Sequence, residues 1–293
     1  MRTARSGRLR AFVVATVLVA PLTTFAAEGD MAAPVPPTEE ELTVIEEVGW
    51  RIARHQEARE KARDRVAGMK NFRSMLGGET VLEGNQSWRV LFLKDPPPQD
   101  RRKRPLIMLE VEYHPASGET GYPNVMVPPR EAEARLVSFY RAGQIALVKV
   151  IENMPSPGPL ELAVFRVKRG QFMGYITSKT APDGHIRFGG DHVVRVATTG
   201  RRIESIEPLH AGPPVDVSLT ARDDGDPTLH THVLLDRPTA TDVALVMRHP
   251  SLAPHLVFTP HFMYRIDAQG QIMYLGESLL PPGGDGGAET EGP

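Results

Sequence analysis

The sequence predicts an α+β protein with a largely antiparallel sheet, and two observations carry that prediction. Runs of β-branched and aromatic residues follow one another through short turns, such as Thr199-Gly200 and Ala268-Gln269-Gly270. These runs are not separated by helices at regular intervals, as the strands of a doubly wound parallel sheet are. We therefore expect an N-terminal helical arm and two short helices beside one antiparallel sheet.

The first 26 residues have the pattern of a secretory signal peptide. The apolar run Ala11–Ala20 is shorter than the roughly 20 residues that span a bilayer, and Thr24-Phe25-Ala26 offers small residues before a cleavage after Ala26. The basic residues ahead of that run are Arg2, Arg5, Arg8 and Arg10. We expect a soluble periplasmic or extracellular protein, with no stable membrane insertion after signal cleavage.

The mature chain is predicted to begin with a flexible linker over residues 27–37 and a helical arm over residues 38–76. Thr38 and Glu41 have the spacing of a capping box at the start of this arm. The apolar residues that recur at spacings of three and four are Leu42, Ile45, Val48 and Ile52. From His55 to Lys70 the pattern turns polar, so we expect a packing helix with a wet outer face.

Residues 38–277 are predicted to form a single α+β domain, whose body, residues 87–277, is rich in strands. The expected strands are Ser87–Lys94, Leu106–Tyr113, Ile145–Ile151, Leu160–Lys168, Phe172–Ser178, His192–Thr198, Arg202–Glu207, Val215–Leu219, Leu229–Leu235, Leu256–Thr259, Phe262–Asp267 and Gln271–Leu275. Short helices are expected near residues 131–142, closed by Gly143 as a C′ glycine, and near residues 240–248. The tail, residues 278–293, is expected to be disordered because Gly283–Pro293 holds no large apolar residue.

Composition excludes several classes of function. The chain has no cysteine, which removes thiol nucleophiles and cysteine-bound zinc, and its net charge of −2 is the wrong sign for a nucleic-acid binder. The basic cluster Arg101–Arg104 lies in a proline-rich loop and is interpreted as solvated. Glu110 and Glu112 alternate with apolar residues, which is typical of the solvent side of a strand. We expect an unknown protein or small-molecule partner in the envelope and no nucleic acid.

The stretch LHTHVLLDRPTATDV, residues 229–243, is the strongest candidate for chemistry. Because side chains alternate along a strand, His230 and His232 point to the same face, and Asp242 on the next helix could supply a third ligand. Two neutral imidazoles and a carboxylate can hold zinc and leave an open position for water. Eight of the ten histidines lie between His185 and His261, which also directs attention to this half.

A purely structural interpretation of the same residues stays open. Pro238 ends the strand, Thr239 or Thr241 caps the helix, and Asp242 complements the positive end of the helix dipole. In that case His230 and His232 form the wetter face of the strand and bind nothing.

The HxH and TxxD pattern resembles the JAB/MPN (JAMM) metallopeptidases, whose signature is HxH, a seven-residue gap and SxxD. The resemblance implies zinc ligands at His230, His232 and Asp242, and Thr239 in place of the serine. The gap is one residue shorter here. The family also has an upstream glutamate as general base, for which Glu161 and Glu152 are the candidates.

A broader resemblance covers roughly residues 130–277. HIRFGGDHVVRVATTGRRIES, HTHVLLDRPTATDVALV and FMYRIDAQGQIMYL together are similar to a group of uncharacterised exported bacterial proteins. This resemblance implies an exported α+β protein and no activity. The sequence therefore favours a non-catalytic envelope binding or interaction protein. The alternatives are a JAMM-like zinc-dependent peptidase or hydrolase and a periplasmic metal-binding protein.

Overall fold

The α+β class is confirmed, because antiparallel strand pairs predominate and three helices lie among the described elements. The computed structural model describes residues 33–69, 76–100, 103–154, 158–167, 170–179, 185–211, 215–218 and 226–278. The expected signal peptide, most of the expected linker and all of the expected tail except Ser278 lie outside the described residues. Within the described part of the chain, no helix is both long and apolar enough to cross a membrane.

Helix α1 (Glu39–Ala67) begins with the predicted capping box. The Thr38 hydroxyl accepts a hydrogen bond from the Glu41 backbone N–H at 3.2 Å, and the Glu41 carboxylate accepts one from the Thr38 N–H at 2.8 Å. The helix ends at Ala67, with Gly68 as its C-cap, and residues 70–75 of the predicted arm lie outside the described residues. The first described residues after the gap that follows lead directly into a strand.

The second half of α1 buries one face and keeps an outer polar face, where Glu60, Arg63 and Asp64 are exposed. Its small side chains allow close packing: Ala58 and Ala62 are fully buried beneath the first sheet. Its polar side chains find internal partners, since Gln56 Nε2 donates to Thr177 Oγ1 at 2.8 Å. The alanines in this half of α1 therefore allow the helix to pack closely against its neighbours. Along its length, α1 lies against all three larger sheets and against helix α4 (Ala240–Arg248).

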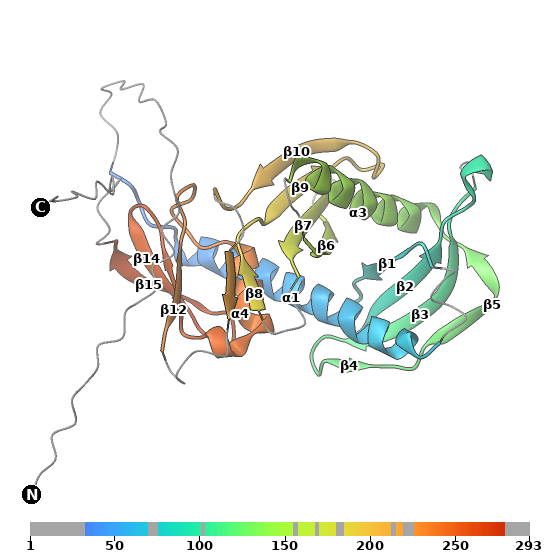
Figure 1. Ribbon diagram of the computed structural model, residues 1–293, viewed down its shortest axis with the longest axis horizontal. Helices are drawn as coiled ribbons and strands as arrows, with labels where there is room; N and C mark the ends of the chain where they lie inside the picture. Colours follow the sequence, from blue (N-terminus) through green and yellow to red (C-terminus); the bar gives the residue numbers. More distant parts are fainter. Residues whose placement is uncertain are drawn as a thin grey trace, which may run out of the picture. The chain divides into compact units, whose positions relative to one another are not determined.

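The first sheet covers the C-terminal half of α1 (Figure 1). Its strands are β1 (Gly78–Leu82), β2 (Trp88–Lys94), β3 (Leu106–His114), β4 (Glu119–Thr120) and β5 (Asn124–Glu131), and a short 3₁₀ turn, η1 (Pro98–Asp100), follows β2. The order is β1-β2-β3-β4, with β5 also paired to β3. Leu109, Val111 and Tyr113 are buried while Glu112 is exposed, so the predicted alternation along β3 is confirmed. Glu110 lies 3.9 Å from Arg89 on the neighbouring strand.

Helix α3 (Ala134–Asn153) overturns two predictions. Gly143 does not end the helix, and the expected strand Ile145–Ile151 is the second half of α3. The reason is packing: a Cβ on Gly143 would lie 3.1 Å from Leu162 Cδ2 and 3.3 Å from Val164 Cγ2. The glycine permits close approach of the helix to the neighbouring sheet, and that burial outweighs the helix propensity lost.

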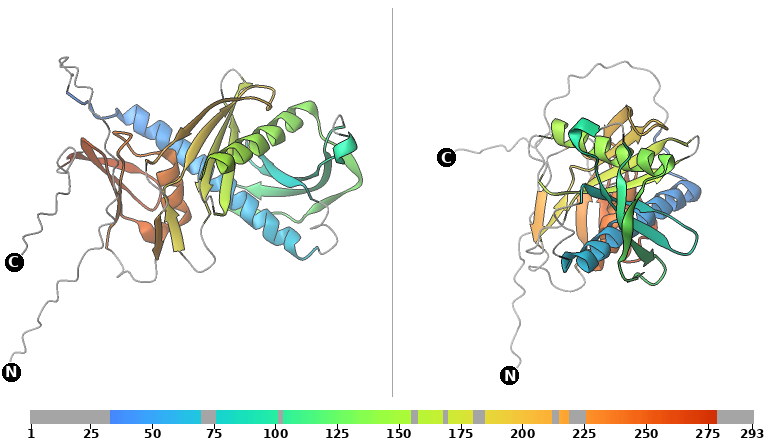
Figure 2. Two further views of the ribbon diagram at one scale, coloured as in Figure 1. Left: turned by 45° about the horizontal axis from the view of Figure 1, so that its top comes forward. Right: turned by 90° about the vertical axis from the view of Figure 1, so that its right-hand side faces the viewer.

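The second sheet lies against α3, as Figures 1 and 2 both show. Its strands, in spatial order, are β10 (Ile203–Pro208), β9 (His192–Val196), β7 (Phe172–Ser178) and β6 (Leu160–Arg166). The predicted turn at Thr199-Gly200 joins β9 to β10, and Gly200 adopts a φ of 69°. Beside this sheet, β8 (His185–Phe188) and β11 (Val215–Ser218) form a separate antiparallel pair.

The third sheet contains the one parallel pair among the described strands. It has the order β12 (Thr228–Thr231), β13 (His255–Phe258), β14 (Phe262–Ile266) and β15 (Ile272–Glu277). Helix α4 and a 3₁₀ turn, η3 (Pro250–Leu252), connect β12 to β13, and these two strands run parallel. The predicted helix near residues 240–248 is confirmed as α4, and the largely antiparallel arrangement includes this one parallel pair. The predicted strand Leu229–Leu235 is also shorter than expected, because the chain leaves the sheet after Thr231.

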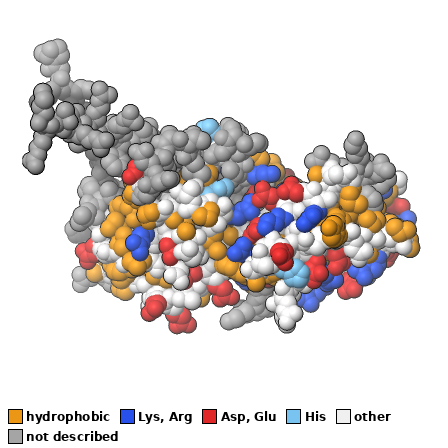
Figure 3. All heavy atoms as spheres, turned by 90° about the horizontal axis from the view of Figure 1, so that it is seen from below, with side chains coloured by type: hydrophobic (Ala, Val, Ile, Leu, Met, Phe, Trp, Pro, Cys, Tyr) orange, Lys and Arg blue, Asp and Glu red, His pale blue; other side chains and the backbone are white. Residues whose placement is uncertain are grey.

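Charged side chains of both signs are intermixed on the face drawn in Figure 3. Ion pairs along α1 illustrate this mixing: Glu57 accepts from Arg54 at 2.5 Å and from Lys61 at 2.7 Å. Such exposed or half-exposed pairs each contribute little to stability, about 0.2–1 kcal/mol.

Candidate metal centre

Four side chains converge at the end of β12. The ligand-capable atoms of His210, His230, His232 and Asp242 all lie within 4.8 Å of one another. Three of these residues are the ones that the sequence motif singles out, and the structure brings them together. His210, which follows β10, was not predicted.

The β12–α4 connection positions three of the four residues. His230 and His232 lie two residues apart, and the His232 backbone N–H donates to the Phe258 carbonyl at 2.7 Å, so the pairing with β13 extends one residue past β12. This bond keeps both imidazoles on one face. His232 is 3% exposed, which corrects the expectation that these histidines form a wet face.

Asp242 serves the helix cap and the cluster at once. Its Oδ2 accepts hydrogen bonds from the Thr239 N–H at 2.6 Å and the Thr239 hydroxyl at 2.8 Å, which completes the capping box of α4. Its Oδ1 lies 3.2 Å from His230 Nε2 and 3.5 Å from His210 Nε2. The cap and the ligand interpretation of Asp242 are therefore compatible, because each uses mainly one carboxylate oxygen.

Burial and charge set the protonation states of the cluster. Burial raises the pKa of Asp242, but His232, His230 and His210 more than offset that effect and hold the pKa well below its usual value. Burial lowers the pKa of His230 and keeps this imidazole neutral, in spite of Asp242. Burial lowers the pKa of His210, but the carboxylates of Asp242 and Asp191 raise it by more, so the net shift is upward. The centre thus contains an ionised carboxylate and at least one neutral imidazole.

A chain of hydrogen bonds determines which nitrogen of His230 carries the proton. The Thr228 hydroxyl donates its only proton to the Leu252 carbonyl at 2.5 Å, so His255 Nδ1–H must donate to Thr228 Oγ1, also at 2.5 Å. His255 Nε2 is then an acceptor, and His230 Nδ1–H donates to it at 2.7 Å. His230 Nε2 therefore presents a lone pair to the cluster, which is the form that binds a metal ion.

The distance between His230 Nε2 and His232 Nε2 is 2.7 Å. Two protonated nitrogens cannot approach so closely, so with no ion bound the two nitrogens share one proton in a hydrogen bond. The Asp242 carboxylate and His210 lie beside the same two nitrogens, so a cation that displaced this proton would meet four ligand-capable groups.

Substituting Thr228 tests whether this hydrogen-bond chain supports a metal ligand. Thr228→Val keeps the shape of the side chain but removes the hydroxyl, so His255 and then His230 lose their fixed tautomers. We expect zinc affinity to fall by about 10- to 100-fold, the usual effect of losing such outer support. Competition with a chromophoric chelator measures the affinity. Thr231→Val on the exposed side of β12 is the control, and equal affinities for both variants would contradict the prediction.

Asp191 is a second buried carboxylate beside the cluster. Burial raises its pKa to about 6, although His210 and the Thr241 hydroxyl act in the opposite direction. Its Oδ2 lies 3.9 Å from His210 Nδ1. Asp191 precedes β9 and His210 follows β10, and the backbone bond from Leu209 N–H to the Asp191 carbonyl at 2.9 Å closes this end of the hairpin.

Neither residue has a local motif that marks it as functional. In the sequence, Asp191 belongs to a Gly-Gly-Asp-His stretch that forms a turn into β9, where Gly189 and Gly190 have φ values of 80° and 73°. His210 is one of the clustered histidines but stands at no ligand spacing. The hairpin pairing alone brings the two residues together, so only the fold reveals them.

The upstream glutamate of the JAMM pattern is not part of the described cluster. Glu152 is on the exposed side of α3 and pairs with Lys149 at 2.5 Å, and Glu161 lies in β6 opposite Thr177. Neither belongs to the group of ligand-capable residues around His230.

Comparisons with known proteins leave the chain without an assigned family. No protein-family model matches it, and no curated protein matches it in sequence at a significant level.

Proposed function

We propose that this protein is an exported metal-binding protein that holds one divalent transition-metal ion, zinc in the first place, through His210, His230, His232 and Asp242. The observation that carries this proposal is the convergence of these four side chains within 4.8 Å. Imidazole nitrogen and carboxylate oxygen are ordinary zinc ligands, and the third ordinary one, cysteine thiolate, does not occur in the chain.

Charge balance supports an ion at this place. Three neutral imidazoles and one carboxylate leave one net positive charge on a bound divalent ion. The Asp191 carboxylate, next to His210, offsets that charge when it is ionised. The 3.9 Å between His210 Nδ1 and Asp191 Oδ2 is longer than a hydrogen bond, so Asp191 supports the site through its charge.

The number of ligands favours metal holding over hydrolysis. A tetrahedral site with four protein ligands is closed, whereas a catalytic zinc keeps one position for water or substrate. His210 supplies the fourth ligand where a JAMM-like peptidase has an open position. The envelope location is part of the proposal and is supported by the signal-like residues 1–26.

The test is the metal content of the mature protein, purified without a metal-binding tag and measured by mass spectrometry after exposure to zinc and removal of excess. We expect about one zinc per chain in the parent protein, as a closed four-ligand site implies. His230→Ala and His210→Ala are expected to lose it. His261→Ala is the matched control, because His261 is half exposed and pairs with Asp236 at 2.8 Å, away from the cluster.

The outcomes separate the two metal hypotheses. A parent protein that retains no metal, or a His230→Ala variant that retains it fully, contradicts the proposal. Full zinc in His210→Ala together with loss in His230→Ala means that His210 is not a ligand. That result favours the open site of a hydrolase instead.

A further inference from the structure

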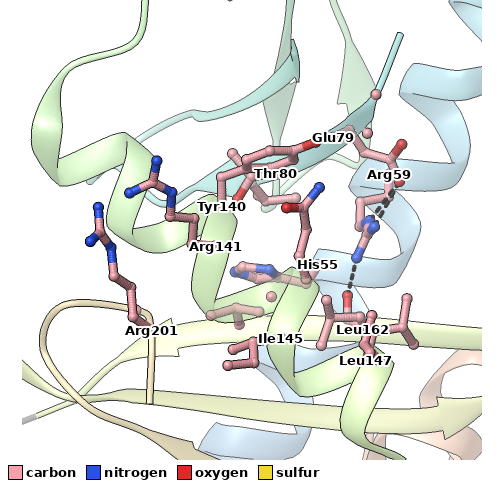
Figure 4. Close-up of a pocket in the computed structure, with 18 residues that line it drawn as sticks. His55, Arg59, Glu79, Thr80, Tyr140, Arg141, Ile145, Leu147, Leu162 and Arg201 are labelled. Atoms are coloured by element: carbon pink, nitrogen blue, oxygen red, sulfur yellow. Dashed lines mark hydrogen bonds and ion pairs between the residues drawn. The ribbon is translucent and has the colours of Figure 1, made fainter. Parts of the chain in front are cut away.

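A second candidate site lies apart from the metal centre. A cavity of about 730 Å³ opens between α3, β1, β6 and α1, and Figure 4 shows its lining. This volume falls within the range of about 300–1,000 Å³ that small-molecule sites occupy. None of the four metal-centre residues lines it, so its function is independent of the proposed metal site.

The wall that α3 and β6 provide is apolar. Ile145, Leu147 and Val148 come from α3, and Leu162 and Val164 come from β6. Val148 is 50% exposed, so an aliphatic side chain that could be buried faces the opening. An aliphatic ligand would cover this surface, with about 25 cal/mol gained for each Å² of apolar area removed from water.

The polar groups deeper in the cavity already have partners. Arg59 Nη2 lies 2.7 Å from Glu79 Oε1, and a second Arg59 nitrogen donates to the Leu162 carbonyl, as the dashed lines in Figure 4 indicate. The Tyr140 hydroxyl donates to Asp95 Oδ2 at 3.0 Å. These groups therefore do not require a charged ligand.

Two arginines at one side of the cavity differ from Arg59. Among the described residues, no hydrogen bond or ion pair is formed by Arg141 or Arg201, and Figure 4 shows both guanidinium groups on the side opposite Arg59. Arg141 precedes Ile145 and Val148 by four and seven positions, so the three share one face of α3.

The turn before Arg201 is held against α3. Gly200 adopts a φ of 69°, and a Cβ at this position would collide with the Ser138 carbonyl, one turn ahead of Arg141. This close approach brings Arg201 to the same part of α3 as Arg141. Two cations without an anion therefore border an apolar cavity.

From this arrangement we infer that the cavity binds an anionic single-chain amphiphile, with its carboxylate or phosphate between Arg141 and Arg201 and its alkyl chain against Ile145, Leu162 and Val164. Arginine suits such a headgroup because its planar fork donates two parallel hydrogen bonds to a carboxylate or phosphate. Contact between the alkyl chain and the apolar wall then adds binding free energy, which a small anion without an alkyl chain does not gain.

Isothermal titration of the full mature protein with decanoate tests the inference. We expect binding with a Kd on the order of 10 μM, weakened about tenfold by Arg141→Ala and by Arg201→Ala. Decyl phosphate is expected to bind comparably. Decanol, which keeps the chain without the charge, and inorganic phosphate, which keeps the charge without the chain, are each expected to bind at least about tenfold more weakly.

Neighbouring arginines provide matched controls. Arg135→Ala changes an exposed position on α3, and Arg202→Ala removes a side chain that is 77% exposed and pairs with Glu204. Neither lines the cavity, so both are expected to bind decanoate as the parent does. Val148→Glu, at a half-exposed position that tolerates charge, is expected to weaken binding about tenfold or more by repulsion.

Three results would overturn the inference. Equal affinity for decanol and decanoate would remove the role of the arginines, and tight binding of inorganic phosphate would make this a simple anion site. Unchanged decanoate binding in the Arg141→Ala, Arg201→Ala double variant would place the ligand elsewhere.

Discussion

Asp242→Asn is expected to lower zinc affinity on the order of a thousandfold. Four ligands share an apparent binding free energy of about 10–16 kcal/mol in structural zinc sites, so each contributes roughly 2.5–4 kcal/mol, and the one charged ligand is expected at the upper end of that range. Asparagine has nearly the same shape but lacks the negative charge that faces His210, His230 and His232. Among the four ligand substitutions, loss of the Asp242 carboxylate is therefore expected to lower zinc affinity the most.

Thr239→Ala is the variant that separates the two roles of Asp242. It removes the capping hydroxyl and is expected to lower the free energy of unfolding by about 1 kcal/mol. The Thr239 N–H still holds Asp242 Oδ2, so zinc affinity is expected to fall by no more than about tenfold, the lower end of outer-shell effects.

Chelator competition gives the zinc affinity of each variant, and urea unfolding of the metal-free proteins gives the stability. If Asp242 were a helix cap and nothing else, both substitutions would reduce stability and neither would change zinc binding. That outcome would remove Asp242 from the site.

Gly49→Ala is expected to destabilise the protein by about 2 kcal/mol, although the same change in an exposed helix stabilises it. A Cβ on Gly49 would lie 2.5 Å from Val243 Cβ and 2.9 Å from the Ala240 carbonyl. Val243 is fully buried and β-branched, so neither neighbour can rotate away. Helices α1 and α4 must then separate, and α4 carries Asp242, so zinc affinity should fall as well.

Gly68→Ala on the same helix is the matched control. Within the described part of the chain, no atom outside the helix's own backbone lies within 4 Å of a Cβ at this position, and Gly68 has a right-handed φ of −73° that alanine adopts readily. We expect a gain of about 0.4–1 kcal/mol there, because alanine restricts the unfolded chain. Thermal unfolding of both variants gives the comparison, and a stabilising effect at both glycines would show that α1 and α4 do not pack as described.

Local signals predicted the elements whose local preference and tertiary packing agree. Thr38 and Glu41 mark the start of α1 because a capping box acts within one turn of helix. The Ala268-Gln269-Gly270 turn between β14 and β15 was predicted for the same reason, since Gly270 supplies the φ of 86° that the turn requires.

The sequence was a poorer guide where contacts with residues far along the chain decide the local structure. Gly143 has the local preference of a helix end, but its contact with Leu162 and Val164 of β6 keeps it in the middle of α3. The polar pattern from His55 onward did not indicate which polar residues are buried, and Gln56 is buried against Thr177 on β7, far along the chain. Amphipathic periodicity reports which side chains are apolar, and it does not report which polar side chains find partners inside.

Some residues of the candidate metal centre could be predicted from local patterns, and others could not. The sequence by itself predicted that His230, His232 and Asp242 could converge, because alternation along a strand and the first turn of the next helix are local geometry. Only the tertiary structure added His210 and Asp191, which approach the site through the β9–β10 hairpin, and His255, which pairs across the parallel strands. Ligands close in sequence share one local frame, whereas the others are placed by strand pairing over tens of residues, which no local pattern encodes.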